Sequence, residues 1–140
     1  MLKKLKEKYN KDREFSNLII IILIGITFFI TTLIIRNLII KKDFEFLKKK
    51  VFYKFNGWSM MHLFQYITIG YLSPKYSILA FLLGIIFEFI EYFLYLNFKS
   101  IKYISYKFKL DPLINFIGLL IGLFLYKIYP NNINLKDYFK

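Results

Sequence analysis

Residues 76–98, YSILAFLLGIIFEFIEYFLYLNF, decide how the rest of this chain can fold. At a rise of about 1.5 Å per residue, a helix of this length reaches about 34 Å, enough to cross a hydrocarbon core of about 30 Å. The stretch carries two glutamates, Glu88 and Glu91, among its Leu, Ile and Phe residues. Inserting the apolar side chains is worth about 4 to 8 kcal/mol, and two ionised carboxylates cost on the order of 5 to 7 kcal/mol. Because the two terms nearly cancel, the glutamates must be protonated, paired, bound to a metal or placed in a wet cavity.

The composition is that of a membrane protein. The chain has 140 residues, of which 57% are hydrophobic and 21% aromatic, with a mean hydropathy of +0.45. The sequence has no cysteine, which excludes disulfides, thiolate metal sites and cysteine nucleophiles. The net charge of +12 comes from Lys and Arg residues that lie almost entirely outside the apolar runs. We therefore expect them to meet the headgroups of membrane lipids, anionic ones above all, rather than nucleic acid.

Three further stretches are long and apolar enough to be membrane helices, namely residues 18–40, 57–73 and 112–129. The first follows a short charged segment, so a cleaved signal peptide is the alternative interpretation. We expect the stretch to be retained, because its apolar run is too long for a signal peptide and no small-residue cleavage site follows it. The sequence thus predicts an all-α integral membrane protein, a four-transmembrane-helix bundle in which residues 1–140 form one multi-pass membrane domain.

The connections between these stretches differ in character. Ser73, Pro74 and Lys75 break the helix and predict a tight antiparallel hairpin between the second and third spans. Residues 41–56 and 99–110 alternate aromatic rings with lysines, a pattern typical of segments that lie at headgroup depth and also compatible with ordinary basic loops.

The last span has an acidic start. Asp111 and Pro112 stand in the favoured order of an N-cap followed by proline at the first helical position. Lys and Arg residues are almost equally divided between the two faces that a four-span chain would have, so the charge asymmetry that usually sets membrane orientation is missing.

The polar and small residues of each span share one helical face. They are His62 and Gln65 in the second span, Gly84, Glu88 and Glu91 in the third, and Asp111, Asn115, Gly118 and Gly122 in the last. Each span therefore has one polar stripe to bury. Gly84, Gly118 and Gly122 would let helix backbones approach closely beside these stripes, as small residues do at membrane helix contacts.

Depth along each helix gives an independent argument. The second and last spans begin at the membrane face where the third span ends, so the rise per residue places every polar group relative to that face. His62 then lies about 7 Å in and Asn115 about 5 Å in, with Asp111 at the rim. Glu91 lies about 10 Å in and Glu88 about 15 Å in. Because all five fall in one half of the membrane, we predict that they line a single binding pocket.

Several chemical roles follow from these residue types. Two carboxylates a helical turn apart, with an imidazole nearby, form a site for a divalent cation, for which Glu88, Glu91 and His62 are the candidate metal ligands. The same carboxylates crowd each other, so one of them is suited to hold a proton near neutral pH and to act as a general acid or a proton relay. Lysines of the two long links would ring this mouth of the bundle and attract a phosphate-bearing lipid headgroup.

A structural interpretation stands beside the functional ones. His62 alone is more often a hydrogen-bonded core histidine, Asn115 can join helices, and Asp111 can cap one. Glu88 and Glu91 favour function, because carboxylates inside a membrane are costly and usually functional.

Between residues 57 and 126 the chain resembles the VanZ-like superfamily of small polytopic membrane proteins. The motifs are E-x-x-E at Glu88 and Glu91 and D-x-x-x-N-x-x-G-x-x-x-G from Asp111 to Gly122, preceded by a histidine, His62, in the span before. The segment G-W-S-x-x-H that ends at His62 is similar to one in short proteins of bacteria and large DNA viruses. The chain departs from the family in having Tyr92 where many VanZ-like chains have Gln, and in lacking the Arg often found before the aspartate. The family is associated with resistance to glycopeptide antibiotics in some bacteria and has no established reaction, so the resemblance implies a membrane fold without implying catalytic residues.

The sequence is compatible with three functions. The first is a pocket that binds a cation or a polar lipid headgroup. The second is a structural membrane subunit or assembly factor, in a homo- or hetero-oligomer, whose polar residues only lock helices together. The third is a lipid-modifying enzyme, although the sequence lacks the motifs of lipid phosphatases, CDP-alcohol transferases, rhomboid proteases and zincins. Mutual hydrogen bonds without a cavity would favour the structural function, and an open pocket would favour binding or catalysis.

Overall fold

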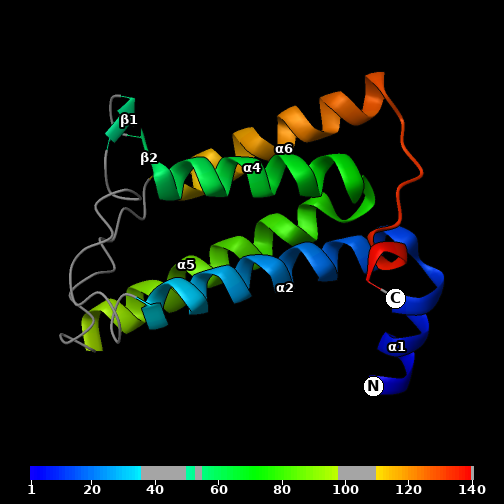
Figure 1. The fold of residues 1–140 in the computed structure, drawn as a ribbon, viewed down its shortest axis with the longest axis horizontal. Helices are drawn as coiled ribbons and strands as arrows, with labels where there is room; N and C mark the ends of the chain where they lie inside the picture. The colour runs from blue at the N-terminus through cyan, green and yellow to red at the C-terminus, as the bar shows by residue number, and fades with distance from the viewer. Residues whose placement is uncertain (36–49, 53–54, 98–109, 140) are drawn as a thin grey trace.

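The computed structural model describes residues 1–35, 50–52, 55–97 and 110–139. Most of these residues are helical, as predicted. The helices are α1 (Leu2–Lys11), α2 (Arg13–Ile34), α4 (Gly57–Leu72), α5 (Ser77–Asn97) and α6 (Asp111–Ile128), with the 3-10 turns η2 (Pro74–Tyr76) and η3 (Leu135–Tyr138). A short antiparallel ribbon of β1 (Lys50–Phe52) and β2 (Phe55–Asn56) precedes α4, and its register pairs Lys50 with Asn56. The long helices run between two ends of the molecule, and both chain termini lie at the same end (Figure 1).

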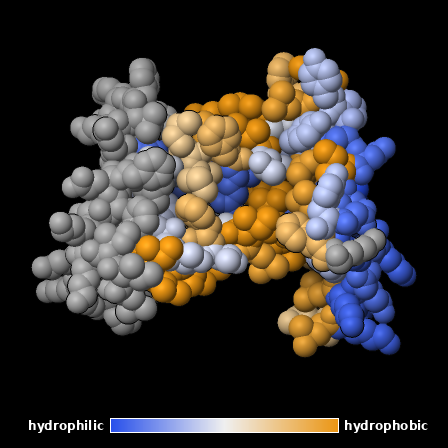
Figure 2. Space-filling view, viewed as in Figure 1, coloured by the Kyte–Doolittle hydropathy of each residue, from blue (hydrophilic) through white to orange (hydrophobic). Residues whose placement is uncertain are grey.

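Two of these helices, α2 and α6, are each long and apolar enough to cross a membrane. α4 and α5 pass the same test only as a pair, which is bent by 116° at η2. The described part of the chain therefore holds two helices that are long and apolar enough to cross a membrane, or up to three if the bent pair counts as one span. Figure 2 shows apolar surface along the long helices and hydrophilic surface at the end that holds the termini.

The connection between α4 and α5 is wider than the predicted tight antiparallel hairpin. A full reversal of direction would be a bend close to 180°, whereas these helices turn by 116° and splay apart (Figure 1). η2 separates the two helices, because Pro74 opens a 3-10 turn there and the buried ring of Tyr76 packs against Phe15 at the start of α2.

Helix boundaries agree with three of the predicted spans to within one residue at either end, and differ for the first. α2 begins at Arg13, five residues before the predicted start, because the side chain of Asp12 caps it by accepting a hydrogen bond from the Phe15 amide at 3.1 Å. The charged residues before it form α1. Residues 36–40 of the predicted span, and most of the two basic links, lie outside the described residues.

The prediction that Asp111 is an N-cap is wrong. Leu110 is the N-cap of α6, and its carbonyl accepts a hydrogen bond from the Ile114 amide at 2.9 Å. Leu110 has helical backbone angles, so the helix starts one residue earlier than expected and Asp111 becomes its first residue. The carboxylate still lies in the first turn, where negative charge interacts favourably with the helix dipole.

α4 and α6 pack against each other more extensively than any other pair of described elements. Their backbones touch at three glycines, Gly70, Gly118 and Gly122. A Cβ atom added at Gly122 would lie 2.9 Å from the Cα of Gly70, and one added at Gly118 would lie 2.8 Å from the carbonyl oxygen of Leu63. No side chain larger than hydrogen fits at these positions without moving backbone, so the glycines set the distance between the two helices.

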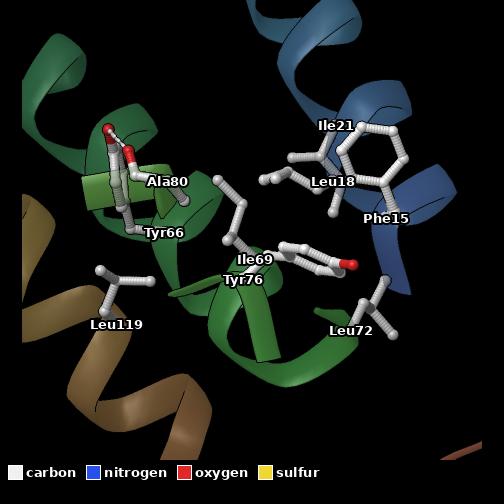
Figure 3. Close-up of a cluster of buried hydrophobic side chains, with 9 residues drawn as sticks. All are labelled: Phe15, Leu18, Ile21, Tyr66, Ile69, Leu72, Tyr76, Ala80 and Leu119. Carbon is white, nitrogen blue, oxygen red and sulfur yellow. Dashed lines mark hydrogen bonds between the residues drawn. The ribbon is translucent and has the colours of Figure 1, made fainter. Parts of the chain in front are cut away.

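A hydrophobic cluster joins the four long helices near the end that holds the termini (Figure 3). Its buried members are Phe15, Leu18 and Ile21 of α2, Tyr66, Ile69 and Leu72 of α4, Tyr76 of η2, Ala80 of α5 and Leu119 of α6. The rings of Phe15 and Tyr76 meet edge to face, with centroids 5.4 Å apart. The cluster fixes the start of α2 against the turn between α4 and α5.

Asn17 connects three parts of the chain at this end. Its side chain is 0% exposed and donates hydrogen bonds to the carbonyls of Leu72 at 3.1 Å and Ile133 at 2.9 Å. Its amide oxygen accepts a hydrogen bond from the Leu135 amide at 2.8 Å. The C-terminal segment is thus held against the first span, a connection that the sequence analysis did not anticipate.

Asp12 forms a second polar contact beside Asn17. Its carboxylate accepts hydrogen bonds from the Tyr76 hydroxyl at 2.6 Å, the Lys75 ammonium at 3.1 Å and the Phe15 amide at 3.1 Å. Burial raises the pKa of this carboxyl, but the hydrogen bonds outweigh that effect and lower the pKa from 3.8 to about 2. The ionised form of Asp12 therefore stabilises the fold.

Gly122→Ala should destabilise the protein by about 1 to 3 kcal/mol, because the new methyl group would meet backbone atoms of α4 that cannot move without separating the helices. Gly25→Ala is the matched control, since a Cβ there meets only the flexible side chain of Gln65. Thermal unfolding of both variants in the same detergent measures the difference. Equal melting temperatures for the two variants would show that the α4–α6 contact is not close.

Asp12 should make stability depend on acid pH. Its native pKa lies below its unfolded value, so its contribution is present above about pH 4 and is lost as the pH falls toward about 2. We expect a contribution on the order of 1 kcal/mol, reduced by solvent screening because the side chain is 22% exposed. The difference in unfolding free energy between wild type and Asp12→Asn should therefore vanish toward about pH 2. Glu7→Gln, at an exposed position of α1, is the control that removes a carboxylate but keeps the contacts of Asp12. The same pH dependence in both variants would contradict the role of Asp12.

Candidate functional site

The structure brings together His62 on α4 and Asn115 on α6. The Nδ1 atom of His62 lies 3.2 Å from the Oδ1 atom of Asn115, a hydrogen-bonding distance. In the tautomer that donates from Nδ1 to this amide oxygen, Nε2 of His62 is left as an acceptor. Asn115 is fully buried and His62 is only half-buried. The pair therefore orients the imidazole from inside the bundle while its other nitrogen can face a ligand.

Glu88 lies deep between the helices, on α5. Its side chain is 2% exposed. One helical turn earlier, Gly84 lies where a Cβ would collide with the Tyr66 hydroxyl and would be 3.5 Å from the Nδ2 atom of Asn115. Glu88 also interacts electrostatically with Tyr66. The absence of a side chain at Gly84 thus makes room for polar groups of α4 and α6, next to the carboxyl of Glu88.

Tyr66 was missed as a member of this cluster. It follows His62 by four residues, so both side chains lie on the same face of α4, and this spacing was visible in the sequence. Its hydroxyl donates a long hydrogen bond of 3.5 Å to the carbonyl of Ala80 (Figure 3). Tyr66 therefore links the hydrophobic cluster to the polar groups around Glu88.

A cavity of about 310 Å³ lies between α2, α4 and α5. His62, Gln65, Tyr66 and Gly84 line one part of it, so the cavity and the polar cluster share residues. The remaining lining is almost entirely apolar and includes Ile22, Ile26, Phe28, Phe29, Trp58, Met61, Ile69, Leu83, Phe87 and Ile90. Its volume lies at the lower end of the range of small-molecule sites.

Gln65 enters this cavity because α2 has a glycine opposite to it. A Cβ at Gly25 would lie 3.1 Å from the Cδ atom of Gln65. Farther along the cavity, Phe29 makes edge-to-face contacts with Trp58 and Phe87, with centroids 6.3 Å and 5.6 Å apart. The lining thus combines amide, imidazole and phenol groups with a long apolar wall.

The charge of the residues that line the cavity limits which ligands it can bind. No Lys or Arg occurs among the described residues that form it. The carboxyl of Glu88 is buried and interacts electrostatically with Tyr66, which lines the cavity. An anionic group would meet no counter-charge here, so the cavity suits an apolar chain with a neutral or cationic polar end.

The remaining two of the five predicted site residues are Asp111 and Glu91. Asp111 lies at the start of α6, partly exposed, one helical turn before Asn115. Glu91 belongs to α5, but its side chain lies outside the described part of the structure. Among the side chains that are described, no group of three or more His, Cys, Asp and Glu residues is placed to hold a metal ion.

Comparisons with protein-family models, with curated proteins and with solved structures find no match to this chain. The resemblance to VanZ-like proteins therefore depends on the motif residues alone and stays a prediction.

Proposed function

We propose that this chain is a multi-pass membrane protein of VanZ-like type that binds an amphiphilic lipid in the cavity between α2, α4 and α5. In this proposal α2, α4, α5 and α6 all cross the bilayer as a four-helix bundle. The support is their arrangement, since the long helices run between the same two ends of the molecule (Figure 1). α4, with 16 residues, is about 24 Å long, so the membrane would have to be thin or deformed around it.

The main support for lipid binding is the set of residues that line the cavity. Apolar side chains from three helices form most of the wall, and His62, Gln65 and Tyr66 place hydrogen-bonding groups along one strip of it. A lipid chain would lie along the apolar wall, where its transfer from the membrane costs little. The polar end of the lipid would donate a hydrogen bond to Nε2 of His62 and exchange hydrogen bonds with the Gln65 amide.

Two buried polar residues interact with the side chains of this strip. Asn115 orients the imidazole of His62 through their hydrogen bond. Glu88 supplies negative charge, or a proton acceptor, close to Tyr66, and thereby favours a hydroxyl or amine over a phosphate in the cavity. Glu91 and Asp111 belong to the same half of the bundle by helical depth and would lie toward the entrance.

A structural function is the second candidate, because one observation favours it. The buried Asn115 bonds to a side chain of the neighbouring helix, next to the glycine contacts between α4 and α6. Such a pair can hold two helices together without taking part in binding any ligand. Binding measurements separate the two functions, because a lock needs no ligand.

A brominated long-chain alcohol should quench the fluorescence of Trp58 saturably in the purified protein. Trp58 is the only tryptophan of the chain and lines the cavity, so bromine bound there would contact it. Leu83→Phe adds bulk to the cavity wall and should weaken binding about tenfold, or about 1.4 kcal/mol. Leu82→Phe is the matched control, because the neighbouring Leu82 is exposed and is not part of the lining. Equal binding by both variants would contradict the proposed location.

Glu88→Gln should leave the protein at least as stable as wild type, because the neutral amide has the same shape and a lower desolvation cost. We expect this variant to lose the preference for a brominated long-chain amine over the alcohol, since that preference depends on the carboxylate. Metal content, measured beside Glu91→Gln, tests the cation alternative. If Glu88→Gln unfolds and the wild type binds neither probe nor metal, the cluster is architectural.

A further inference from the structure

α1 is an amphipathic helix at the end of the molecule that holds the termini. Leu2, Leu5 and Tyr9 are spaced i, i+3 and i+7 and share one face. The other faces carry five lysines and one glutamate, namely Lys3, Lys4, Lys6, Lys8, Lys11 and Glu7. Figure 1 shows that α1 turns away from the line of α2. A basic amphipathic helix of this kind is typical of segments that lie in a membrane interface.

The apolar face of α1 is largely exposed. Leu2 is 81% exposed and Leu5 is 45% exposed, and only Tyr9 packs partly against the hydrophobic cluster. Exposed leucines on a helix that leads directly into a membrane-crossing helix are not explained by contacts within the described chain.

Contacts with the rest of the molecule hold α1 in this orientation. The ammonium of Lys8 lies 4.7 Å from the ring centroid of Phe15 and 4.8 Å from that of Tyr76. From the other end of the chain, Lys136 donates a hydrogen bond of 2.9 Å to Asn10 and lies 5.2 Å from the ring of Tyr9. These contacts come from three elements, α2, η2 and η3, so rotation of α1 to bury its leucines against the bundle would break both sets of contacts.

The outer face of α2 continues the apolar surface of α1. A groove of about 560 Å³ runs along this face, lined by Ile20, Leu23, Ile24 and Phe28 together with two aromatic residues from the termini, Tyr9 and Phe139. Because α2 is a candidate membrane span, this groove faces lipid chains when α2 is inserted. Tyr9 and Phe139 would then lie at headgroup depth, where aromatic rings are favoured.

We propose that α1 lies in the membrane–water interface and binds the surface of an anionic bilayer. Leu2 and Leu5 enter the boundary between headgroups and chains, and the lysines contact lipid phosphates. The charge of α1 supports this partner, since its five lysines outnumber its one acidic residue. The inference is independent of the proposed cavity ligand, because α1 contributes no residue to the cavity between α2, α4 and α5.

Tryptophan reporters in the full-length chain test the placement of α1. In a Trp58→Phe background, Leu5→Trp puts the reporter on the apolar face, and Glu7→Trp puts it on the charged face as the matched control. In vesicles of bromine-labelled phosphatidylglycerol, quenching should be roughly twofold or more stronger for Leu5→Trp. Equal quenching of the two reporters, or quenching of neither, would overturn the proposal.

The preference for anionic lipid has its own test. Replacing Lys3, Lys4 and Lys6 by Gln in the Leu5→Trp reporter should weaken the preference for brominated phosphatidylglycerol over brominated phosphatidylcholine by roughly fivefold per lysine. High salt should weaken the preference of the parent reporter in the same direction. A preference unchanged by both treatments would show that charge does not hold α1 at the membrane.

Discussion

The rest of the structure depends on the direct backbone contact between α4 and α6. Gly70, Gly118 and Gly122 allow the two helices to approach until a single added methyl group would collide with main-chain atoms. In a membrane, where lipid is as apolar as a leucine side chain, such close packing is a main source of helix association. It also sets the distance across which His62 and Asn115 meet. The polar cluster is therefore a consequence of the glycine contact, and any change in that distance would first be felt at the His62–Asn115 hydrogen bond.

Features that depend on local sequence were predictable, and those that depend on distant partners were not. Apolar runs bounded by proline and polar residues located α4, α5 and α6 to within a residue, because burial in lipid requires an uninterrupted apolar length. The start of α2 was misplaced, since it depends on the capping side chain of Asp12, which lies outside the apolar run that begins at Leu18. The sequence around Asn17 does not predict its contacts. Its three hydrogen bonds reach backbone groups at least 55 residues away, and nothing in its neighbourhood reveals that the C-terminal segment returns to it.

The candidate site was also predictable only in part. Helical spacing and depth placed His62 and Asn115 at the same level, which the structure brings into contact. A pocket was predicted, but not its walls. Of the predicted pocket residues whose side chains are described, only His62 lines the cavity, because the cavity arises from the 116° bend that splays α5 away from α4 and from the approach of α2 to the opening. Helical spacing predicts which residues share a face, whereas the empty space between three helices is set by the turn. Gln65 and Tyr66 are candidate binding residues only because they line that space.

Lipids at α1 and a lipid in the cavity would meet very different charge in this molecule. No Lys or Arg occurs among the described residues that line the cavity, and the buried carboxyl of Glu88 interacts with Tyr66 of the lining. By contrast, α1 carries five lysines on an exposed helix. Anionic lipids would therefore gather at the terminal end and be disfavoured inside the cavity. Under the two proposals, a protein with this distribution would separate the lipids that anchor it from the lipid that it binds. Such a separation would let the cavity remain selective in a membrane whose bulk lipid is anionic, because binding at α1 would not compete with binding beside His62.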